Sequence, residues 1–247
     1  MTIKKQDVCM KISVIIPMYN ESRIIADTAK TVSEYMSENF EDYEVIFSDD
    51  GSSDRSADIV NELGLCDVKA IRYDKNRGKG YAVRQGMLDA TGDICIFTDA
   101  DLAYGTSVIG EAVNMMESHD SADMLIGSRN IAKNGYEGYT FLRKIMSKTY
   151  IKVLCVMGGF KLSDSQCGFK AFRQDCVKAI FSECTVDGFA FDFEVILRAL
   201  KHNKKIIEMP VKIINHRESS VRPMSDSVKM LGDLSKIKKQ IKKEGRD

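Results

Sequence analysis

The stretch GDICIFTDADLAYG, residues 92–105, decides the expected fold and chemistry of this chain. Its apolar run at 94–97 is typical of a buried strand, and the run leads into two aspartates one residue apart, Asp99 and Asp101. Two carboxylates this close repel each other unless a cation lies between them. Hard divalent ions such as Mg²⁺ and Mn²⁺ take oxygen ligands and typically share them with substrate phosphates. The stretch therefore indicates a metal-binding strand end or, in the simpler alternative, a turn in which the aspartates bond to the backbone.

Short apolar runs alternate with longer mixed segments along most of the chain. This alternation predicts βαβ units, and hence an α/β domain with a mainly parallel sheet flanked by helices. We expect one domain at 1–225, followed by a basic amphipathic helix at 226–247. The expected strands are 11–17, 43–50, 68–73, 93–99, 124–128 and 204–214, and the expected helices are 22–38, with Ser22 as its cap, 54–63, 79–90, 106–117, 139–157, 191–202 and 226–243.

The composition limits the class of protein. The chain has 247 residues, 44% of them hydrophobic, which is enough for a sizeable core. Its 36 basic residues balance 36 acidic ones, so no overall field attracts nucleic acid. We expect no signal peptide, because MTIKKQDVCM is polar, and no run reaches the ~18 apolar residues of a membrane span. The seven scattered cysteines indicate reduced, mostly buried thiols in a cytosolic protein, and no His/Cys cluster has zinc-site spacing.

Three expected strands end in polar residues, at the edge where open parallel sheets bind their ligands. The three groups are Tyr19-Asn20-Glu21, Asp49-Asp50-Gly51-Ser52 and Asp99-Ala100-Asp101. A tight turn with a helix cap from Ser52, Ser53 or Asp54 explains part of the second group. It leaves Asp50 unexplained, and a carboxylate there suits a ribose hydroxyl or a base N–H.

The loop NRGKGY, at 76–81, leads into an expected helix. Gly78 and Gly80 permit close backbone approach, and a helix N-terminus favours anions. Val83 breaks the spacing of a dinucleotide fingerprint, and the loop is not a Walker A motif. The loop is therefore a candidate anion-binding segment.

Together these motifs resemble the family 2 inverting glycosyltransferases of GT-A fold, in particular the dolichyl-phosphate β-glucosyltransferases and their bacterial polyprenyl-phosphate relatives. The resemblance spans about 11–237. SVIIPMYNES and VIFSDDGSSD resemble motifs of the whole family, NRGKGYAVRQGMLDATGD, FTDADLA and IGSRN match the subgroup closely, and DSQCGFK followed by FAFDFE is the most specific. The resemblance implies inverting transfer of a hexose, with glucose from UDP-glucose favoured, onto a polyprenyl or dolichyl phosphate. Another nucleotide sugar or a non-prenyl acceptor is the alternative.

The resemblance also assigns roles to residues. Asp99 and Asp101 would bind Mg²⁺ or Mn²⁺ against the donor diphosphate, and the metal would stabilise the departing nucleoside diphosphate. Asp192 would lie near the acceptor and Asp164 in the sugar pocket, so these four aspartates form the expected catalytic group. The expected nucleotide-sugar-binding residues are Pro17, Tyr19, Asn20, Glu21, Asp49, Asp50, Gly78, Lys79, Asp99, Ala100, Asp101 and Gln166.

On the acceptor side, Arg129 and Arg143 resemble the family's acceptor-phosphate arginines, and Ser147 lies one turn after Arg143. Arginine suits bidentate phosphate binding, although ordinary surface arginines are the alternative. A polyprenyl phosphate is already an anionic nucleophile, so a general base is not required.

The sequence departs from the subgroup at three places. Ser165 stands where threonine is usual, which is a mild change. Tyr104-Gly105 stands where Thr-Pro is usual, which puts the lid above the metal, and with it the sugar preference, in doubt. Ala103 cannot supply the further metal ligand that a glutamine provides in mannosyl relatives.

Two basic amphipathic segments suggest contact with an anionic membrane, where a polyprenyl acceptor resides. Lys144, Lys148 and Lys152 recur every four residues, and residues 229–247 carry seven Lys/Arg against three Asp/Glu. We expect peripheral attachment at the cytoplasmic face of the membrane. The alternative is that these helices pack on their own domain with solvated basic faces.

Two other classes of function remain open. A phosphatase of the haloacid-dehalogenase type also has DxD after a strand, but usually on the first strand, whereas here it follows the fourth. A non-catalytic nucleotide-sugar-binding module would bind the donor without turnover. The sequence does not give the oligomeric state.

Overall fold

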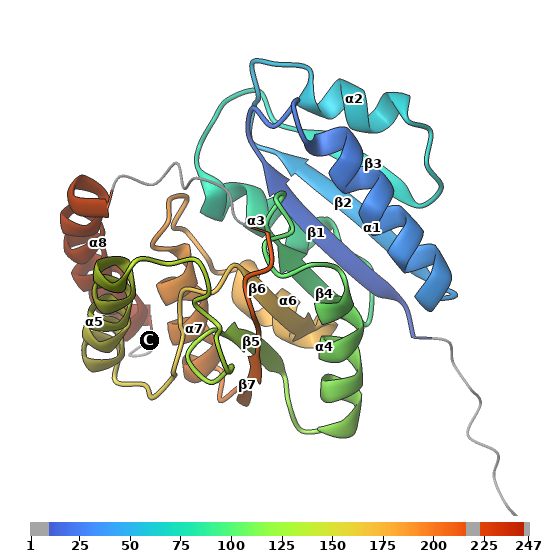
Figure 1. The fold of residues 1–247 in the computed structure, drawn as a ribbon. Helices are drawn as coiled ribbons and strands as arrows, with labels where there is room; N and C mark the ends of the chain where they lie inside the picture. Colours follow the sequence, from blue (N-terminus) through green and yellow to red (C-terminus); the bar gives the residue numbers. More distant parts are fainter. Residues whose placement is uncertain (1–9, 216–222, 245–247) are drawn as a thin grey trace, which may run out of the picture.

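The computed structural model describes residues 10–215 and 223–244 as one sheet with helices packed on it (Figure 1). The seven strands lie in the order β3-β2-β1-β4-β6-β5-β7, so β4, which precedes the paired aspartates, is the middle strand. The strands are β1 (Ile12–Met18), β2 (Tyr43–Asp49), β3 (Val68–Arg72), β4 (Ile94–Thr98), β5 (Met124–Ser128), β6 (Phe169–Arg173) and β7 (Ile206–Pro210).

The helices cover both faces of the sheet. Every residue of β1 and β4 is buried, which requires cover on each side. One group contains α3, which packs on β1 and β2 and contacts α6 and α7, and another contains α1 and α2. The helices are α1 (Ile25–Asn39), α2 (Ser56–Glu62), α3 (Lys79–Asp89), α4 (Ser107–Ser118), α5 (Phe141–Gly158), α6 (Gln174–Phe181), α7 (Phe191–Lys201) and α8 (Pro223–Glu244). The apolar residues they bury supply the main stabilising term, at roughly 1.5–3 kcal/mol for each fully buried large side chain.

The sheet is mixed, because β6 runs antiparallel to both of its neighbours. Neither β6 nor the following α6 was among the elements expected from sequence. The apolar pattern of β6 is interrupted by Lys170, the second residue of the strand, which is fully buried. A lysine at such a position argues against a buried strand unless its charge is paired, and the pairing is visible only in three dimensions.

Two other expectations are wrong in detail. Ser22 does not cap the first helix, which begins at Ile25 without a side-chain cap bond. The last strand is shorter than 204–214 and ends at Pro210, because proline has no N–H for the sheet ladder. Beyond it, the N–H groups of Ile214 and Asn215 donate to the carbonyl of Ala103, at 2.8 and 3.2 Å, just after the paired aspartates.

Most of the described cysteines follow the expectation. Cys95, Cys167 and Cys176 are buried, Cys155 and Cys184 are half-buried, Cys66 is exposed, and none of these forms a disulfide. Burial raises the pKa of the Cys95 and Cys176 thiols to about 12, so both are protonated near neutral pH.

The helices α5 and α8 lie beside each other at one side of the molecule (Figure 1). Leu234 and Ile237 of α8 are buried, so this part of its apolar face packs inside the protein, as in the alternative considered for this helix. Met230 lies outside the described side chains. Within the described residues, no helix is both long and apolar enough to cross a membrane.

Candidate active site at the carboxyl end of the sheet

The loops after β1 and β2 are held together by side-chain bonds to the backbone. The backbone of Asn20 is in the left-handed region, with φ of 54°, which asparagine tolerates better than most residues. Its side-chain Oδ1 accepts the N–H groups of Ser53 and Asp54 at 2.9 and 3.3 Å, and its own N–H donates to Oγ of Ser52 at 2.8 Å. Asn20 therefore fixes the relative position of the two loops.

The adjacent acids Asp49 and Asp50 have different environments. Asp49 is fully buried, and its Oδ1 accepts the N–H of Ser52 at 3.0 Å as well as its hydroxyl. Asp49 therefore shapes the turn, as in the simpler alternative for this motif. Its Oδ2 lies 3.7 Å from Nε of Arg72 and has no hydrogen-bond partner.

Asp50 instead holds the loop that precedes α3. Its Oδ1 and Oδ2 accept the N–H groups of Arg77 and Gly78, at 3.0 and 2.7 Å. Burial raises the pKa of Asp50 above its ordinary value, although these two amides oppose the shift. A Cβ on Gly51, whose φ is 71°, would lie 2.6 Å from the backbone of Lys75, so the loops pack too closely for a side chain there.

A pocket of about 340 Å³ opens beside these loops. It is lined by Gly51, Ser52, Arg72, Tyr73 and Asp74. The last three were not among the residues expected from sequence for the site, although Arg72 and Tyr73 end the third expected strand and Asp74 directly follows it. An aromatic ring with an adjacent acid and arginine is a suitable setting for a nucleotide base and ribose.

The central feature of the site is a cation placed against the first aspartate of the pair. Nζ of Lys79, at the start of α3, contacts Oδ1 of Asp99, and both side chains are partly exposed. Burial alone would lower the pKa of Lys79, but the carboxylates of Asp99, Asp192 and Asp101 outweigh it and raise the pKa above its ordinary value. The sequence placed Lys79 in the nucleotide-sugar site without showing this contact.

The second aspartate takes part in the turn after β4. Oδ1 of Asp101 accepts the N–H of Ala103 at 3.1 Å, and Leu102 has a positive φ of 46°. The turn alternative therefore describes the local geometry correctly. It does not account for the first aspartate, whose side chain lies against Gly168 so closely that a Cβ there would clash with it.

Behind these groups lies a buried ion pair. Nζ of Lys170 is 2.6 Å from Oδ1 of Asp192 and donates to the carbonyl of Cys167 at 2.7 Å. Burial raises the pKa of Asp192 above its ordinary value, while Lys170 and Lys79 act against that rise. The cluster thus alternates acid and base between α3, β4, β6 and α7.

A second buried ion pair joins the expected acceptor and sugar residues. Nε and Nη2 of Arg129 lie 2.6 and 2.9 Å from the two carboxylate oxygens of Asp164, and the Arg129 N–H donates to Asp164 at 3.1 Å. Burial alone would lower the pKa of Arg129, but Asp164 holds it well above the ordinary value. Glu208 of β7 supports the pair, because its Oε1 accepts the Ser163 and Asp164 N–H groups at 2.8 and 3.2 Å. Glu208 was not expected from sequence.

The remaining expected residues are distributed around this edge. Pro17 is buried near the end of β1, and Tyr19, just beyond the strand, is 46% exposed. The N–H of Gln166 donates to Asp164 at 3.3 Å. The carbonyl of Ala100 accepts the Thr28 hydroxyl at 2.8 Å, and the carbonyl of Glu21 accepts the N–H groups of Ile24 and Ile25. Ser147 lies on α5, and its Oγ is 3.4 Å from the hydroxyl of Tyr136. The side chain of Arg143 lies outside the described part of the structure.

The acidic pair fits a divalent ion of the type that shares its ligands with a substrate. Among the described residues, no three His, Cys, Asp or Glu side chains converge as a complete protein-made metal site. Mg²⁺ and Mn²⁺ bound with substrate phosphates typically need one or two carboxylates from the protein. Asp99 and Asp101 supply that number, and the ammonium of Lys79 at Asp99 shows that this position favours a cation.

The fold is that of the GT-A glycosyltransferases, and the chain belongs to glycosyl transferase family 2, which matches residues 13–181. It is 31% identical over 243 residues to the dolichyl-phosphate beta-glucosyltransferase of Dictyostelium discoideum, covering 92% of this chain and 73% of that protein. It is 28% identical over 245 residues to the enzyme of the same name from Saccharomyces cerevisiae, covering 90% and 72%.

A solved structure supports the fold. The glucosyl-3-phosphoglycerate synthase of Mycobacterium tuberculosis, in complex with Mn²⁺, uridine-diphosphate and glucosyl-3-phosphoglycerate, matches with a TM-score of 0.64 at 17% identity, covering 92% of this chain and 76% of that one. The predicted family and fold class are thereby confirmed.

Proposed function

We propose that this protein is an inverting, metal-dependent glycosyltransferase that moves glucose from UDP-glucose onto a polyprenyl or dolichyl phosphate. The observation that carries the proposal is the match, over 92% of the chain, to a relative named as a dolichyl-phosphate beta-glucosyltransferase. The site supports it, because the Asp99 and Asp101 pair stands at the end of the middle strand.

On the donor side, the pocket beside Tyr73 and Asp74 would hold the uridine. The diphosphate would extend toward Lys79 and the N-terminus of α3, where backbone N–H groups and an ammonium favour anions. Asp99 and Asp101 would bind Mg²⁺ or Mn²⁺, which supplies positive charge for the leaving diphosphate when it is bound. Lys79 adds the chain's own positive charge at the same place.

On the acceptor side, Arg129 would orient the lipid phosphate while Asp164 holds the guanidinium in place through two bonds. The phosphate oxygen is the nucleophile, and inversion follows from its in-line attack on the anomeric carbon. Asp192 remains near the reacting groups, where Lys170 fixes it. Arg143 and Ser147 of α5 remain proposed contacts of the same phosphate.

The outer face of α5 supports peripheral contact with an anionic membrane at the cytoplasmic side. Six apolar side chains on this helix are exposed, and they share one face at helical spacing. They are Phe141, Leu142, Ile145, Met146, Val153 and Val156. The α5 sequence contains lysine and arginine but no acidic residue, which suits an anionic lipid surface. In this proposal α5 carries the membrane contact, whereas α8 contributes its basic side chains.

The test is a donor and acceptor assay with the full chain. Purified protein meets UDP-glucose, UDP-galactose, UDP-N-acetylglucosamine or GDP-mannose with Mn²⁺ or Mg²⁺, with and without a polyprenyl phosphate. Nucleoside diphosphate release and the lipid product are both measured. We expect lipid-dependent UDP release from UDP-glucose, lost in Asp101→Asn and kept in Asp120→Asn, an exposed acid outside the site.

Each other outcome contradicts a defined part of the proposal. Metal-dependent UDP binding without lipid-dependent release would remove the acceptor half and leave a donor-binding module. Turnover of a different nucleotide sugar would correct the donor. Hydrolysis of a simple phosphomonoester, with no use of nucleotide sugars, would replace the proposal with the phosphatase alternative.

A further inference from the structure

The segment at 184–188, between α6 and α7, lies against the loop that carries Gly78 and Lys79. A Cβ on Gly78 would be 2.5 Å from the carbonyl oxygen of Asp187, and one on Gly80 would be 2.6 Å from that of Val186. The Tyr81 N–H donates to the Asp187 carbonyl at 3.1 Å. The two backbones therefore touch with no room for side chains between them.

Asp187 adds charged bonds to this contact. Its Oδ2 accepts Nε and Nη2 of Arg77 at 3.1 and 2.8 Å, and its Oδ1 accepts Nη2 of Arg84 at 2.7 Å. Arg77 belongs to the loop at 76–78 before α3, the donor-side loop, and Arg84 belongs to α3. One carboxylate therefore links the loop and the helix. Nη1 of Arg84 also donates to the carbonyl of Cys184 at 3.1 Å, which fixes the start of the segment.

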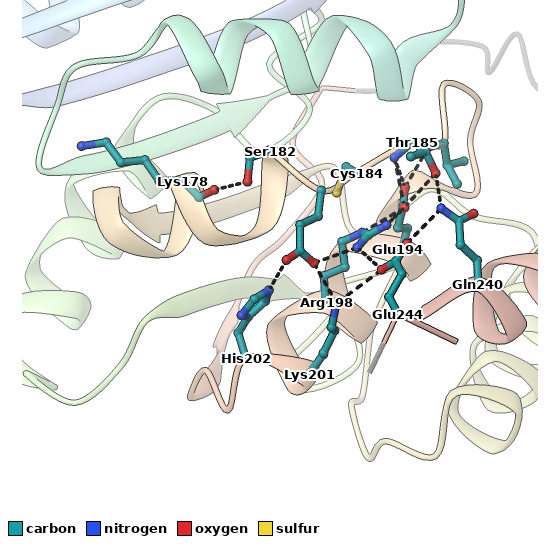
Figure 2. A network of polar contacts seen from close by, with 12 residues as sticks. Lys178, Ser182, Cys184, Thr185, Glu194, Arg198, Lys201, His202, Gln240 and Glu244 are labelled. Carbon is teal, nitrogen blue, oxygen red and sulfur yellow. Dashed lines mark hydrogen bonds and ion pairs between the residues drawn. The ribbon is translucent and has the colours of Figure 1, made fainter. Parts of the chain in front are cut away.

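The segment is itself held from behind by Glu194 of α7. This carboxylate is 1% exposed, and it accepts the N–H groups of Thr185 at 3.0 Å and of Val186 at 2.8 Å. Arg198, which is fully buried, donates to Glu194 at 3.0 Å. Figure 2 shows this network, in which Arg198 also reaches Glu244 of α8 at 3.0 Å.

The donor-side loop is thus fixed from two directions. Asp50 accepts the N–H groups of Arg77 and Gly78 from the β2 side, and Asp187 contacts the same loop from the α7 side. Lys79 follows immediately, with its ammonium on Asp99. A shift of this loop would move that ammonium and the first N–H groups of α3, where the proposed function places the diphosphate.

We propose that the segment at 184–188 is a positioning element for donor binding, with Asp187 as a positioning residue that acts through Arg77 and Arg84. This inference rests on the donor half of the proposed function and does not depend on the acceptor. It predicts an effect opposite in sign to simple electrostatics. Removing a negative charge near an anionic ligand would strengthen binding, whereas loosening the loop weakens it.

The test measures UDP binding by calorimetry in the presence of Mn²⁺, together with thermal unfolding. We expect Asp187→Asn to raise the Kd for UDP roughly 5- to 20-fold, because part of the free energy of the lost charge-assisted bond is transmitted to the ligand. In the transfer reaction it raises KM for the nucleotide sugar and leaves KM for the lipid unchanged. The matched control is Asp123→Asn, since Asp123 is also 26% exposed and ion-paired but lies at the other end of the sheet, before β5.

The conservative variants separate positioning from folding. Asp187→Glu keeps the charge and should recover part of the affinity, and Arg84→Lys keeps the charge of α3 while losing the bond to Cys184, so it should weaken UDP binding. If Asp187→Asn does not fold, Arg84→Lys decides the question. UDP binding equal to or tighter than wild type in a folded Asp187→Asn or Arg84→Lys variant would overturn the inference. A wild-type protein that binds UDP but transfers nothing to lipid would refute only the acceptor half of the proposed function.

Discussion

Replacing Lys170 by methionine tests whether the buried ion pair behind the site is needed for the fold. Lys170 is fully buried, its partner Asp192 is almost so, and their charged atoms are 2.6 Å apart. Removing one partner of such a pair leaves an uncompensated buried charge, which costs about 3–5 kcal/mol. For a chain of this size each kcal/mol lowers Tm by about 2–4 °C, so Lys170→Met should lose ~6–20 °C.

The loss should depend on pH with a defined sign. The pKa of Asp192 is raised in the folded protein, so the folded state holds this proton more tightly than the unfolded state does. A group of this kind lowers the stability of the protein at pH values above its folded pKa. The penalty disappears as the pH falls toward the ordinary pKa of the group. Without Lys170 the pKa rises further, so the deficit of the variant should shrink as the pH falls from 8 to about 4, the ordinary pKa of an aspartate.

Thermal unfolding measures the shift in Tm and urea unfolding the free energy, both followed by circular dichroism at the two pH values. Lys178→Met, an exposed lysine of α6, is the control and should stay near wild type. Adding Asp192→Asn to Lys170→Met should restore much of the stability at pH 8, because no buried charge is then left unpaired. A loss below ~1 kcal/mol, or a loss equal at both pH values, would refute the reasoning.

Three further predictions concern the loops and α5. Gly78→Ala should weaken UDP binding and cost about 1–3 kcal/mol of stability, because φ is 121° and the new methyl group meets the Asp187 carbonyl. Calorimetry measures the binding and urea unfolding the stability, and an unchanged Kd would contradict the tight loop contact. Burial would raise the pKa of Asp54, but hydrogen bonds from the hydroxyl and backbone N–H groups of Ser56 and Ser22 outweigh it and lower the pKa to about 2. The stabilisation by Asp54 is therefore present above pH 4 and lost between about pH 4 and 2. Asp54→Asn should flatten this part of the curve of stability against pH, and an unchanged curve would oppose the idea. Val156→Glu should reduce sedimentation with vesicles containing anionic lipid while donor binding stays unchanged, and equal sedimentation would exclude this face of α5 as the contact.

Much of the fold could be predicted from the sequence, because strand and helix periodicities in the first half are regular. The order of strands and helices through β5 and the expectation of a mainly parallel sheet are confirmed. β6 could not be predicted, because its lysine is acceptable only next to Asp192, twenty-two residues later in the chain. The shift from parallel to antiparallel pairing likewise depends on tertiary contacts.

The site was predictable in part. The carboxyl ends of parallel strands meet at one edge of a sheet, which predicted that the acids after β1, β2 and β4 lie together. The structure confirms that these three strands are parallel neighbours and end at the same edge. The sequence could not show that Asp50 bonds to the loop before α3, or that Arg129 pairs with Asp164, since these partners are far apart in the chain. The roles of these residues toward donor and acceptor remain predictions.

The buried Arg198 has a consequence for how the protein is made. Its guanidinium bonds to Glu183, Glu194 and Glu244, which lie just after α6, on α7 and at the end of α8. On the ribosome, the first two carboxylates emerge with the arginine, but the third arrives only after the whole of α8 has been synthesised. Because domains fold as they emerge, the half of the protein that carries the proposed nucleotide site can form early. The packing around Arg198 must wait for residue 244. A stop shortly before that position would leave a buried cation with one carboxylate fewer, and such a chain should be a preferred substrate for cellular proteases.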